Sequence, residues 1–440
     1  MTTRHRCAGV VLVLVLGPAR LSSGNTDTAL LDKAVQLNRT GKWMQAAELL
    51  EAYLGQTPRP SSQRCQALLS AAYARLRLKQ YDAARAHLRR FEAERAGVTL
   101  PAWYAEQYAK MTRELSDAPA TKTTPRPSNP WPKADPSSLG LNPDAVREHQ
   151  ALCQRTGADS CLVVCRGRVV SEWYSQRYRA PIHAMSSTKS IASLLVGILL
   201  KERKIASLDE RVSTYLPEYK EGRKRKVTIR HLLSHTAGFR KYTDDGVGYV
   251  ADKNAFVRKM PVDYEPGTRF AYSNEGVQLL SPILDKAAGE PIQQYARKKL
   301  FEPLGMSQSR LNVDGAGHAW TYADMLTTPR DFAKIGQLMI NKGKWKGTQI
   351  VDEAYIREAT RPSQRFNTRC GLLWWVYSGG PDILKGFATK GYLNTDLYVF
   401  PREELIVVRT QSPKTVYTGA RESAGYERRA LRLFKQMCGG

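Results

Sequence analysis

The sequence predicts an α+β fold, with one antiparallel β-sheet flanked by helices, an all-helical subdomain and a small helical module in front. Two strand-like runs near residue 165, a helical middle and four strand-like runs after residue 371 indicate a sheet built from both ends of one domain. Helical periodicity over residues 27–115, followed by a proline-rich stretch, indicates the separate module. The chain of 440 residues is 42% hydrophobic and 25% charged, which excludes wholesale disorder, a collagen-like fibre and a polytopic membrane protein.

Residues 1–24 have the layout of a secretory signal. Arg4 and Arg6 precede an apolar run over residues 8–16, and small residues follow at 22–24. Because that run is too short to span a bilayer, we expect export to the periplasm or the extracellular space, with envelope association as a further option. No membrane span is expected after signal removal. Arg20 lies close to the expected cleavage site, which leaves an uncleaved anchor as the alternative.

The module at residues 27–115 contains two related helical patterns. Trp43 and Tyr81 hold matching places in them, a period of about 38 residues. The stretch resembles two degenerate tetratricopeptide units with a closing helix over residues 103–115. Such a module would dock a protein or cell-envelope partner in a groove, or would serve as a stabilising cap. Residues 116–138 are rich in proline and are expected to form an extended linker, which places the main domain at 139–440.

The elements of the main domain follow from local signals. Asn142 and Pro143 start a helix, with asparagine as the cap and proline at the first helical position. Residues 160–165 and 169–173 are expected to pair as a hairpin. A long apolar helix occupies residues 186–201, and helices continue to about residue 358. The later strand-like runs are residues 372–377, 384–388, 396–400 and 405–409, and a helix closes the chain at 428–437.

The net charge and the cysteines bear on partners and cofactors. A formal net charge of +26 attracts polyanions, but no recognised motif concentrates the basic residues, so we expect no nucleic-acid partner.

Cys7 lies in the signal, and the remaining six cysteines form an even set that is compatible with disulfides: Cys65, Cys153, Cys161, Cys165, Cys370 and Cys438. There is no C-x-x-C motif. His231 and His235 are spaced like zinc ligands, but Leu232 stands where a metalloprotease needs glutamate, so neither metal nor cofactor is expected.

Three short motifs carry candidate chemistry. Ser186 and Lys189 at the head of the apolar helix lie on one side of it, which places an amine within reach of a weak nucleophile. Desolvation would lower the lysine pKa enough for it to act as a base. Tyr272 and Asn274 alternate along a short extended segment, so the phenol and the carboxamide could converge on one cleft. Each motif alone is better explained as a helix cap or a core residue.

The third motif starts at Thr389 on a late strand. Gly391 would let an acyl group lie against the strand edge, and the N–H groups of Tyr392 and Ser186 could form an oxyanion hole. Trp374, Trp375 and Tyr377 could wall a cleft, but such a run more often has one face in the core. We therefore leave them out of the site.

In this order, the motifs and their flanking segments resemble the class C-like branch of the serine β-lactamase and penicillin-binding superfamily. The matching segments are 185–190 (MSSTKS), 208–210 (LDE), 215–218 (YLPE), 231–238 (HLLSHTAG), 270–274 (FAYSN), 328–332 (TPRDF) and 399–401 (VFP). The branch includes class C β-lactamases, DD-peptidases, esterases, D-aminopeptidases and oligoamide hydrolases. The resemblance covers about residue 141 to the end of the chain.

The resemblance implies a role for each matching position. Ser186 would be the acylated nucleophile, Lys189 and Tyr272 would share general base and acid duties, and Asn274 would bind the substrate carbonyl. Thr389 stands where the family commonly has lysine or histidine, or alanine in esterase-like members, and Lys390 lies on the other strand face. This departure favours an ester or amide substrate over a β-lactam.

The resulting hypothesis is an exported serine hydrolase that cleaves an ester, amide or peptide bond through an acyl-enzyme. Two alternatives remain. One is a true β-lactamase or DD-peptidase. The other is a catalytically idle relative whose basic, module-bearing chain binds a cell-envelope partner.

Overall fold

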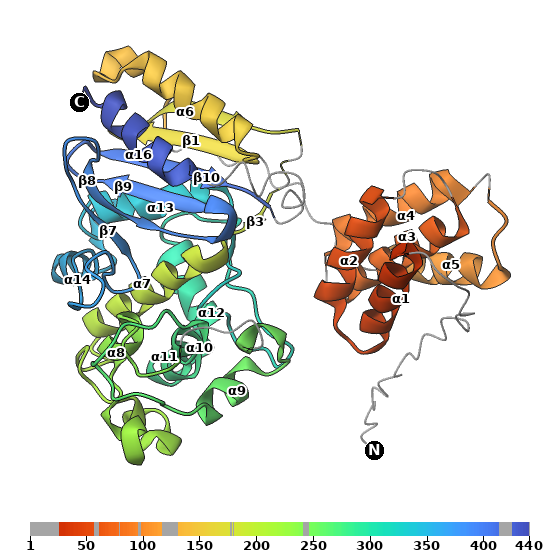
Figure 1. Ribbon diagram of the computed structural model, residues 1–440, viewed down its shortest axis with the longest axis horizontal. Coiled ribbons are helices and arrows are strands. Elements are labelled where there is room, and N and C mark those ends of the chain that lie inside the picture. Colours follow the sequence, from red (N-terminus) through yellow and green to blue (C-terminus); the bar gives the residue numbers. More distant parts are fainter. Residues whose placement is uncertain are drawn as a thin grey trace, which may run out of the picture. The chain divides into compact units, whose positions relative to one another are not determined.

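A computed structural model describes residues 26–56, 61–78, 80–95, 98–116, 131–176, 178, 180–240, 246–412 and 425–439 (Figure 1). Its contacts divide the chain into two units, residues 1–129 and 130–440, which we describe separately. The expected signal at residues 1–24 lies outside the described residues. The helices of the described part include none long and apolar enough to cross a membrane.

The first unit consists of helices that pack in sequence order. They are α1 (Thr26–Arg39), α2 (Trp43–Gln56), α3 (Ser62–Arg77), α4 (Tyr81–Arg95) and α5 (Ala102–Ser116). Alanine and leucine side chains form their common core, and the Arg64 side chain is buried among them in an ion pair with Glu94. The helical module is therefore confirmed, and its resemblance to tetratricopeptide repeats stays a prediction.

The second unit contains a six-stranded antiparallel sheet in the order β2-β1-β10-β9-β8-β7. Its strands are β1 (Ser160–Cys165), β2 (Arg168–Tyr174), β7 (Trp375–Ser378), β8 (Lys385–Thr389), β9 (Asp396–Phe400) and β10 (Leu405–Thr410). Early strand β1 pairs with late strand β10, from Ser160 opposite Thr410 to Cys165 opposite Leu405. The expected sheet from both ends of the domain is confirmed.

Helices cover both faces of this sheet. Helices α6 (Pro143–Arg155) and α16 (Tyr426–Met437) lie side by side on one face (Figure 1). Helices α7 (Thr188–Lys201) and α13 (Pro329–Ile340) cover the other face. Alternate residues of β1 therefore enter different cores: Leu162 packs toward α7 and α13, and Val163 packs toward α6 and α16. This is why every residue of β1 is buried.

The chain between α7 and α13 forms the expected helical subdomain. It contains α8 (Ile229–Leu233), α9 (Lys253–Lys259), α10 (Asn274–Gln278), α11 (Leu280–Ala288) and α12 (Ile292–Ala296). Two short strands, β3 (Ile182–His183) and β4 (Leu326–Thr327), pair next to the start of α7. Helix α14 (Glu353–Ala359) follows a small hairpin of β5 (Lys344–Trp345) and β6 (Thr348–Gln349).

Two boundaries differ from expectation. The segment expected as linker to residue 138 joins the second unit earlier, because Trp131 is buried and the Ala134 N–H donates to the Val169 carbonyl over 3.0 Å. The strand expected at residues 372–377 begins only at Trp375. Leu373 has a φ of +61°, a left-handed conformation that interrupts an extended strand.

Candidate active site

Ser186 lies in a short 3₁₀ turn, Met185–Ser187, immediately before α7. The preceding Met185 has a φ of +50°, which costs a residue with a side chain about 1 kcal/mol or more. Two hydrogen bonds hold the turn: the Ala184 N–H donates to the Met325 carbonyl over 2.7 Å, and the Thr188 hydroxyl donates to the Met185 carbonyl over 2.7 Å. The β3–β4 pair and α7 thereby fix the direction of the serine hydroxyl.

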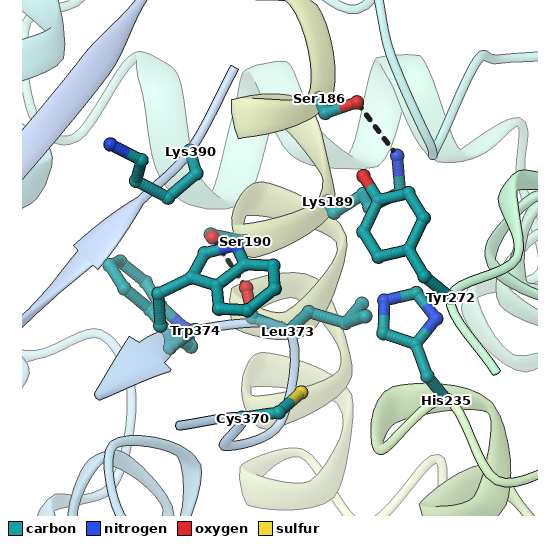
Figure 2. A pocket seen from close by; sticks show the side chains of 10 residues that line it. Ser186, Lys189, Ser190, His235, Tyr272, Cys370, Leu373, Trp374 and Lys390 are labelled. Atoms are coloured by element: carbon teal, nitrogen blue, oxygen red, sulfur yellow. Dashed lines mark hydrogen bonds between the residues drawn. The ribbon is translucent and has the colours of Figure 1, made fainter. Parts of the chain in front are cut away.

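Lys189 lies one helical turn beyond Ser186, and its ammonium nitrogen is 3.0 Å from the Ser186 Oγ (Figure 2). The nitrogen also donates to the Tyr322 carbonyl over 2.7 Å. The side chain is buried, and burial lowers the pKa of Lys189 below its usual value, although the neighbouring Tyr272 and Glu275 act in the opposite direction. A larger fraction of this amine is neutral near pH 7 than for an exposed lysine, which is what a general base requires.

Tyr272 enters the site from the extended segment before α10. Its ring centroid is 4.9 Å from the Lys189 nitrogen, and Figure 2 shows the phenol oxygen on the side that faces Lys189 and Ser186. The His235 ring lies 4.6 Å away and the Trp375 ring 6.5 Å away, between centroids. These rings hold the phenol beside the amine. The structure therefore brings together the serine, the lysine and the tyrosine that the sequence singled out.

Asn274 is the first residue of α10, whose N-cap is Ser273. Its side-chain oxygen is buried and has no hydrogen-bond partner among the described residues. A buried amide oxygen without a donor is costly, so this position suits a ligand or substrate that supplies an N–H group. The residues that line the pocket around Ser186 in the described chain do not include Asn274.

Thr389 and Lys390 differ from the substrate-binding role considered for this motif. The Thr389 hydroxyl is fully buried; it donates to the Ser187 Oγ over 2.9 Å and accepts from the Leu397 N–H over 3.2 Å. Thr389 therefore ties the strand to the turn of Ser186 and does not face a substrate. The Lys390 ammonium binds Asp396 over 2.5 Å, and Figure 2 shows it pointing away from Ser186, as its place on the other strand face predicts.

Gly391 and Tyr392 continue from β8 to the edge of the site. Tyr392 is 63% exposed and begins a tight turn in which Leu393 and Asn394 have positive φ angles. Within the described chain, the main-chain N–H groups of Ser186 and Tyr392 donate to no residue. They remain available for an oxyanion, as the sequence predicts.

Substituting alanine for Gly391 is expected to damage the site. A Cβ atom there would lie 2.5 Å from the Thr395 carbonyl oxygen and 2.7 Å from the Ala184 carbonyl oxygen. Main-chain atoms cannot rotate away, so the strand would move from the turn of Ser186. We expect a loss of about 1–3 kcal/mol in the free energy of unfolding and a fall of at least about tenfold in kcat. Gly380→Ala, in a position with open space around it, is the control. Chemical denaturation and steady-state kinetics would measure both, and unchanged kcat in Gly391→Ala would contradict this reading.

Sequence reasoning missed part of the pocket. His235, Trp374, Trp375 and Cys370 line it together with Ser186, Lys189 and Tyr272. His235 is fully enclosed, and burial beside the positive charge of Lys189 lowers its pKa to about 3, so the ring is neutral at physiological pH. The pocket is partly open, and its volume of about 10 Å³ leaves room for about one water molecule. The aromatic run after residue 373 was the signal that could have revealed this wall.

His231 and His235 have separate roles in the structure. His231 closes a capping box at α8, where its Nδ1 accepts from the Thr228 N–H over 3.3 Å. The Nδ1 of His235 accepts from the Ser273 N–H over 3.3 Å, next to Tyr272. The stretch that contains both thus positions the tyrosine segment.

The comparisons with known proteins agree with this geometry. The beta-lactamase family model matches residues 144–424, more than half of the chain. The chain belongs to the beta-lactamase family. The helical module and the proline-rich segment lie outside the matched residues.

The curated relatives of this chain are distant in sequence. Over 282 residues the chain is 27% identical to an N-acetylmuramyl-L-alanine amidase of Bacillus subtilis, which covers 46% of this chain and 63% of that protein. It is 24% identical over 251 residues to a putative D-alanyl-D-alanine carboxypeptidase of Salmonella agona, which covers 43% of this chain and 58% of that protein. The chain thus spans less than two thirds of either curated relative.

A solved structure supports the fold of this beta-lactamase family member. A putative 6-aminohexanoate-dimer hydrolase from Bacillus anthracis superposes with a TM-score of 0.54 at 20% identity, covering 65% of this chain and 82% of the other. At that identity the likeness shows the fold alone.

Proposed function

We propose that this protein is a serine hydrolase that cleaves an ester or amide bond through an acyl-enzyme on Ser186. The observation that carries the proposal is the 3.0 Å contact between the Lys189 amine and the Ser186 hydroxyl, with the amine buried and its pKa lowered. In the described chain no carboxylate lies within ion-pair distance of this amine. This absence supports a role for the amine as a base rather than as one half of a structural salt bridge.

The proposed reaction consists of acylation and deacylation of Ser186, and every proton is accounted for in both steps. The Ser186 oxygen attacks the substrate carbonyl, its proton passes to Lys189 or Tyr272, and the N–H groups of Ser186 and Tyr392 stabilise the oxyanion. The same pair returns the proton to the leaving alcohol or amine as the tetrahedral intermediate collapses to the acyl-enzyme. A water molecule then attacks the ester on Ser186 and gives a proton to the pair. As the second tetrahedral intermediate collapses, the acid product leaves and the pair passes that proton to the Ser186 oxygen.

Two features support a neutral ester or amide as the substrate class. A β-lactam or a D-peptide carries a carboxylate, which requires a cation beside the third motif. Thr389 occupies that place without a charge, and Lys390 is already paired with Asp396. The printed names of the curated relatives, an amidase and a putative D-alanyl-D-alanine carboxypeptidase, support acyl transfer on amides in general. The uncharged third motif is what ranks a true β-lactamase or DD-peptidase second.

The proposal also covers the location of the protein and the role of its helical module. A basic, exported chain that carries a helical module would work in the periplasm or outside the cell, where cell-wall polymers are acidic. In that setting the module would dock a protein or envelope partner. A catalytically idle protein that only binds such a partner is the competing function, which the altered third motif favours.

A substrate panel tests the proposal. The full chain would be assayed on short and long acyl esters, acyl amides, D-amino-acid peptides and a chromogenic cephalosporin, with a fluorophosphonate probe in parallel. We expect turnover of an ester or amide and a covalent adduct on Ser186. Turnover of the cephalosporin alone would favour the second candidate. A folded protein with neither turnover nor adduct would indicate the idle binder.

A further inference from the structure

A second cluster of reactive side chains lies on the opposite face of the sheet from Ser186. His149 and Cys153 come from successive turns of α6, Cys161 comes from β1, and Tyr426 begins α16. These four residues are at most 1% exposed. The proposed hydrolase mechanism uses none of them. Within the described chain, three of them, His149, Cys153 and Cys161, form a group of side chains close enough to hold a metal ion.

The candidate ligand atoms lie close together: Cys153 and Tyr426 contact the Nε2 of His149, and Cys161 contacts its Nδ1, so a shared ion requires a small shift of these side chains. One atom from each of His149, Cys153 and Cys161 lies within 4.8 Å of the others. The Cys153 Sγ is 3.5 Å from the His149 Nε2, and the Tyr426 hydroxyl is 3.0 Å from that nitrogen and 3.8 Å from that sulfur. A tetrahedral ion with metal–sulfur and metal–nitrogen bonds of about 2.3 and 2.0 Å separates its sulfur and nitrogen ligands by about 3.5 Å.

Without an ion, the cluster is poorly satisfied. The contacts of both thiols with the imidazole are 3.5 Å long and involve sulfur, which is a weak donor and a weak acceptor. Buried side-chain polar atoms usually have at least one hydrogen-bond partner, and the Tyr426 hydroxyl provides one for the Nε2 of His149 over 3.0 Å. At the Nδ1 of His149, the hydrogen-bond partner in the described chain is the Cys161 sulfur alone.

The charge next to the cluster favours an anionic metal complex. Arg409 is fully buried, and its guanidinium carbon lies 4.6 Å from the centroid of the Tyr426 ring. Its hydrogen bonds go to neutral oxygens of residues 156, 393, 394 and 411, and no carboxylate of the described chain is within ion-pair distance. A buried cation without a counter-ion is costly. Two thiolates that bind a cation together with a phenolate would supply the missing negative charge.

We infer that His149, Cys153, Cys161 and Tyr426 form a binding site for a thiophilic d¹⁰ cation, Zn²⁺ or Cu⁺. Soft thiolate ligands with one imidazole select these ions over Mg²⁺ and Ca²⁺. Each thiol, and the Tyr426 phenol where it binds Zn²⁺, releases its proton to solvent when the cation binds. Two thiolates and an imidazole match the ligand number that Cu⁺ accepts, and the Tyr426 oxygen provides the fourth ligand for Zn²⁺.

The site would also be linked to the catalytic turn. Through one nitrogen, Arg409 donates to the Leu393 carbonyl over 2.6 Å and to the Asn394 carbonyl over 3.1 Å. These carbonyls belong to the left-handed turn that follows Tyr392, whose N–H is proposed for the oxyanion hole. An ion in the cluster would hold Arg409 by its charge and would keep that turn in place.

Metal analysis of the full chain tests the site. The protein would be purified without chelators and its zinc and copper measured by mass spectrometry. We expect close to one equivalent of zinc or copper per chain, and the identity of the metal distinguishes the two ions. Cobalt added to chelator-treated protein should give an intense thiolate-to-cobalt charge-transfer band. Removal of the ion should lower the midpoint of thermal unfolding.

Cys153→Ser should lower the bound metal at least tenfold. Cys165→Ser is the matched control, because Cys165 is equally buried on β1 but contacts the Glu403 carbonyl at 3.7 Å and not the cluster. It should retain the full equivalent. Because Cys153→Ser could fail to fold, the analysis of the unmodified chain decides by itself. Absence of stoichiometric metal and of the cobalt band would overturn the site, whether Cys153 and Cys161 are then found as free thiols or as a disulfide.

Discussion

Replacing Ser186 by alanine is expected to lower kcat on a cleaved ester or amide by at least about a thousandfold and to abolish labelling by a fluorophosphonate. The reason is chemical: the hydroxyl 3.0 Å from the Lys189 amine is the atom that would form the acyl-enzyme, and removal of a nucleophile leaves only binding and oxyanion stabilisation. Steady-state kinetics and mass spectrometry of the labelled protein would measure the two effects.

Ser193→Ala is the matched control for this experiment. Ser193 lies on α7, the helix that follows Ser186, is fully buried, and contacts the Tyr355 hydroxyl at 2.9 Å, outside the pocket. We expect it to cost about 1 kcal/mol in the free energy of unfolding and to leave kcat unchanged. An adduct on a serine other than Ser186, or equal activity in Ser186→Ala, would remove the proposed nucleophile.

Replacing Lys189 by methionine is expected to lower kcat by about 10²–10⁴-fold, the usual contribution of a general base. Methionine fills a similar volume without an amine, so the helix should keep its packing.

The dependence of kcat/KM on pH should also change in Lys189→Met. A neutral amine is the active form, so kcat/KM of the unmodified enzyme should rise with pH as Lys189 loses its proton. Because burial lowers the pKa of this lysine, that rise should occur below the pH at which an exposed lysine titrates.

The pH profile distinguishes a base from a merely structural lysine. In Lys189→Met the rising limb should disappear, whereas Lys201→Met, at the exposed end of the same helix, should keep it. A rising limb of the same position in Lys189→Met would assign the titration to another group. His235 could not replace it near neutral pH, since its own pKa is lowered to about 3.

Local patterns were sufficient to predict much of this architecture. Leu162 and Val163 pack into different cores, so β1 is apolar along its whole length and could be recognised as a strand from its sequence. The helical stretch between the early and the late strands indicated that strands from the two ends of the domain pair with each other. Ser186 and Lys189 could be paired because a spacing of three on a helix fixes their proximity whatever surrounds them.

Features that depend on distant contacts could not be predicted in this way. Thr389 was expected to face the substrate, but its direction is set by Ser187, about 200 positions away in the chain. The strand expected from residue 372 starts later because of a single left-handed residue, Leu373. Trp374 is fully buried in the core, as the apolar pattern indicates, and together with Trp375 it also lines the pocket.

The cluster of thiols behind the sheet illustrates the same limit. A search for closely spaced cysteine pairs passes over Cys153 and Cys161, because a helix and a strand, rather than a short loop, bring them together. A spacing of four on α6 does place His149 and Cys153 on one face of that helix. The third residue, Cys161, joins them only because β1 packs against α6.

The pairing of β1 with β10 has a consequence for when activity can first arise. The centre of the sheet joins residues 160–165 to residues 405–410, so a growing polypeptide that already carries Ser186 still lacks the strands on which its helix rests. Long-range pairing of this kind slows folding. We therefore expect Ser186 to gain its supporting sheet only after residues 405–410 have been made, and a polypeptide that lacks them should also lack the proposed activity.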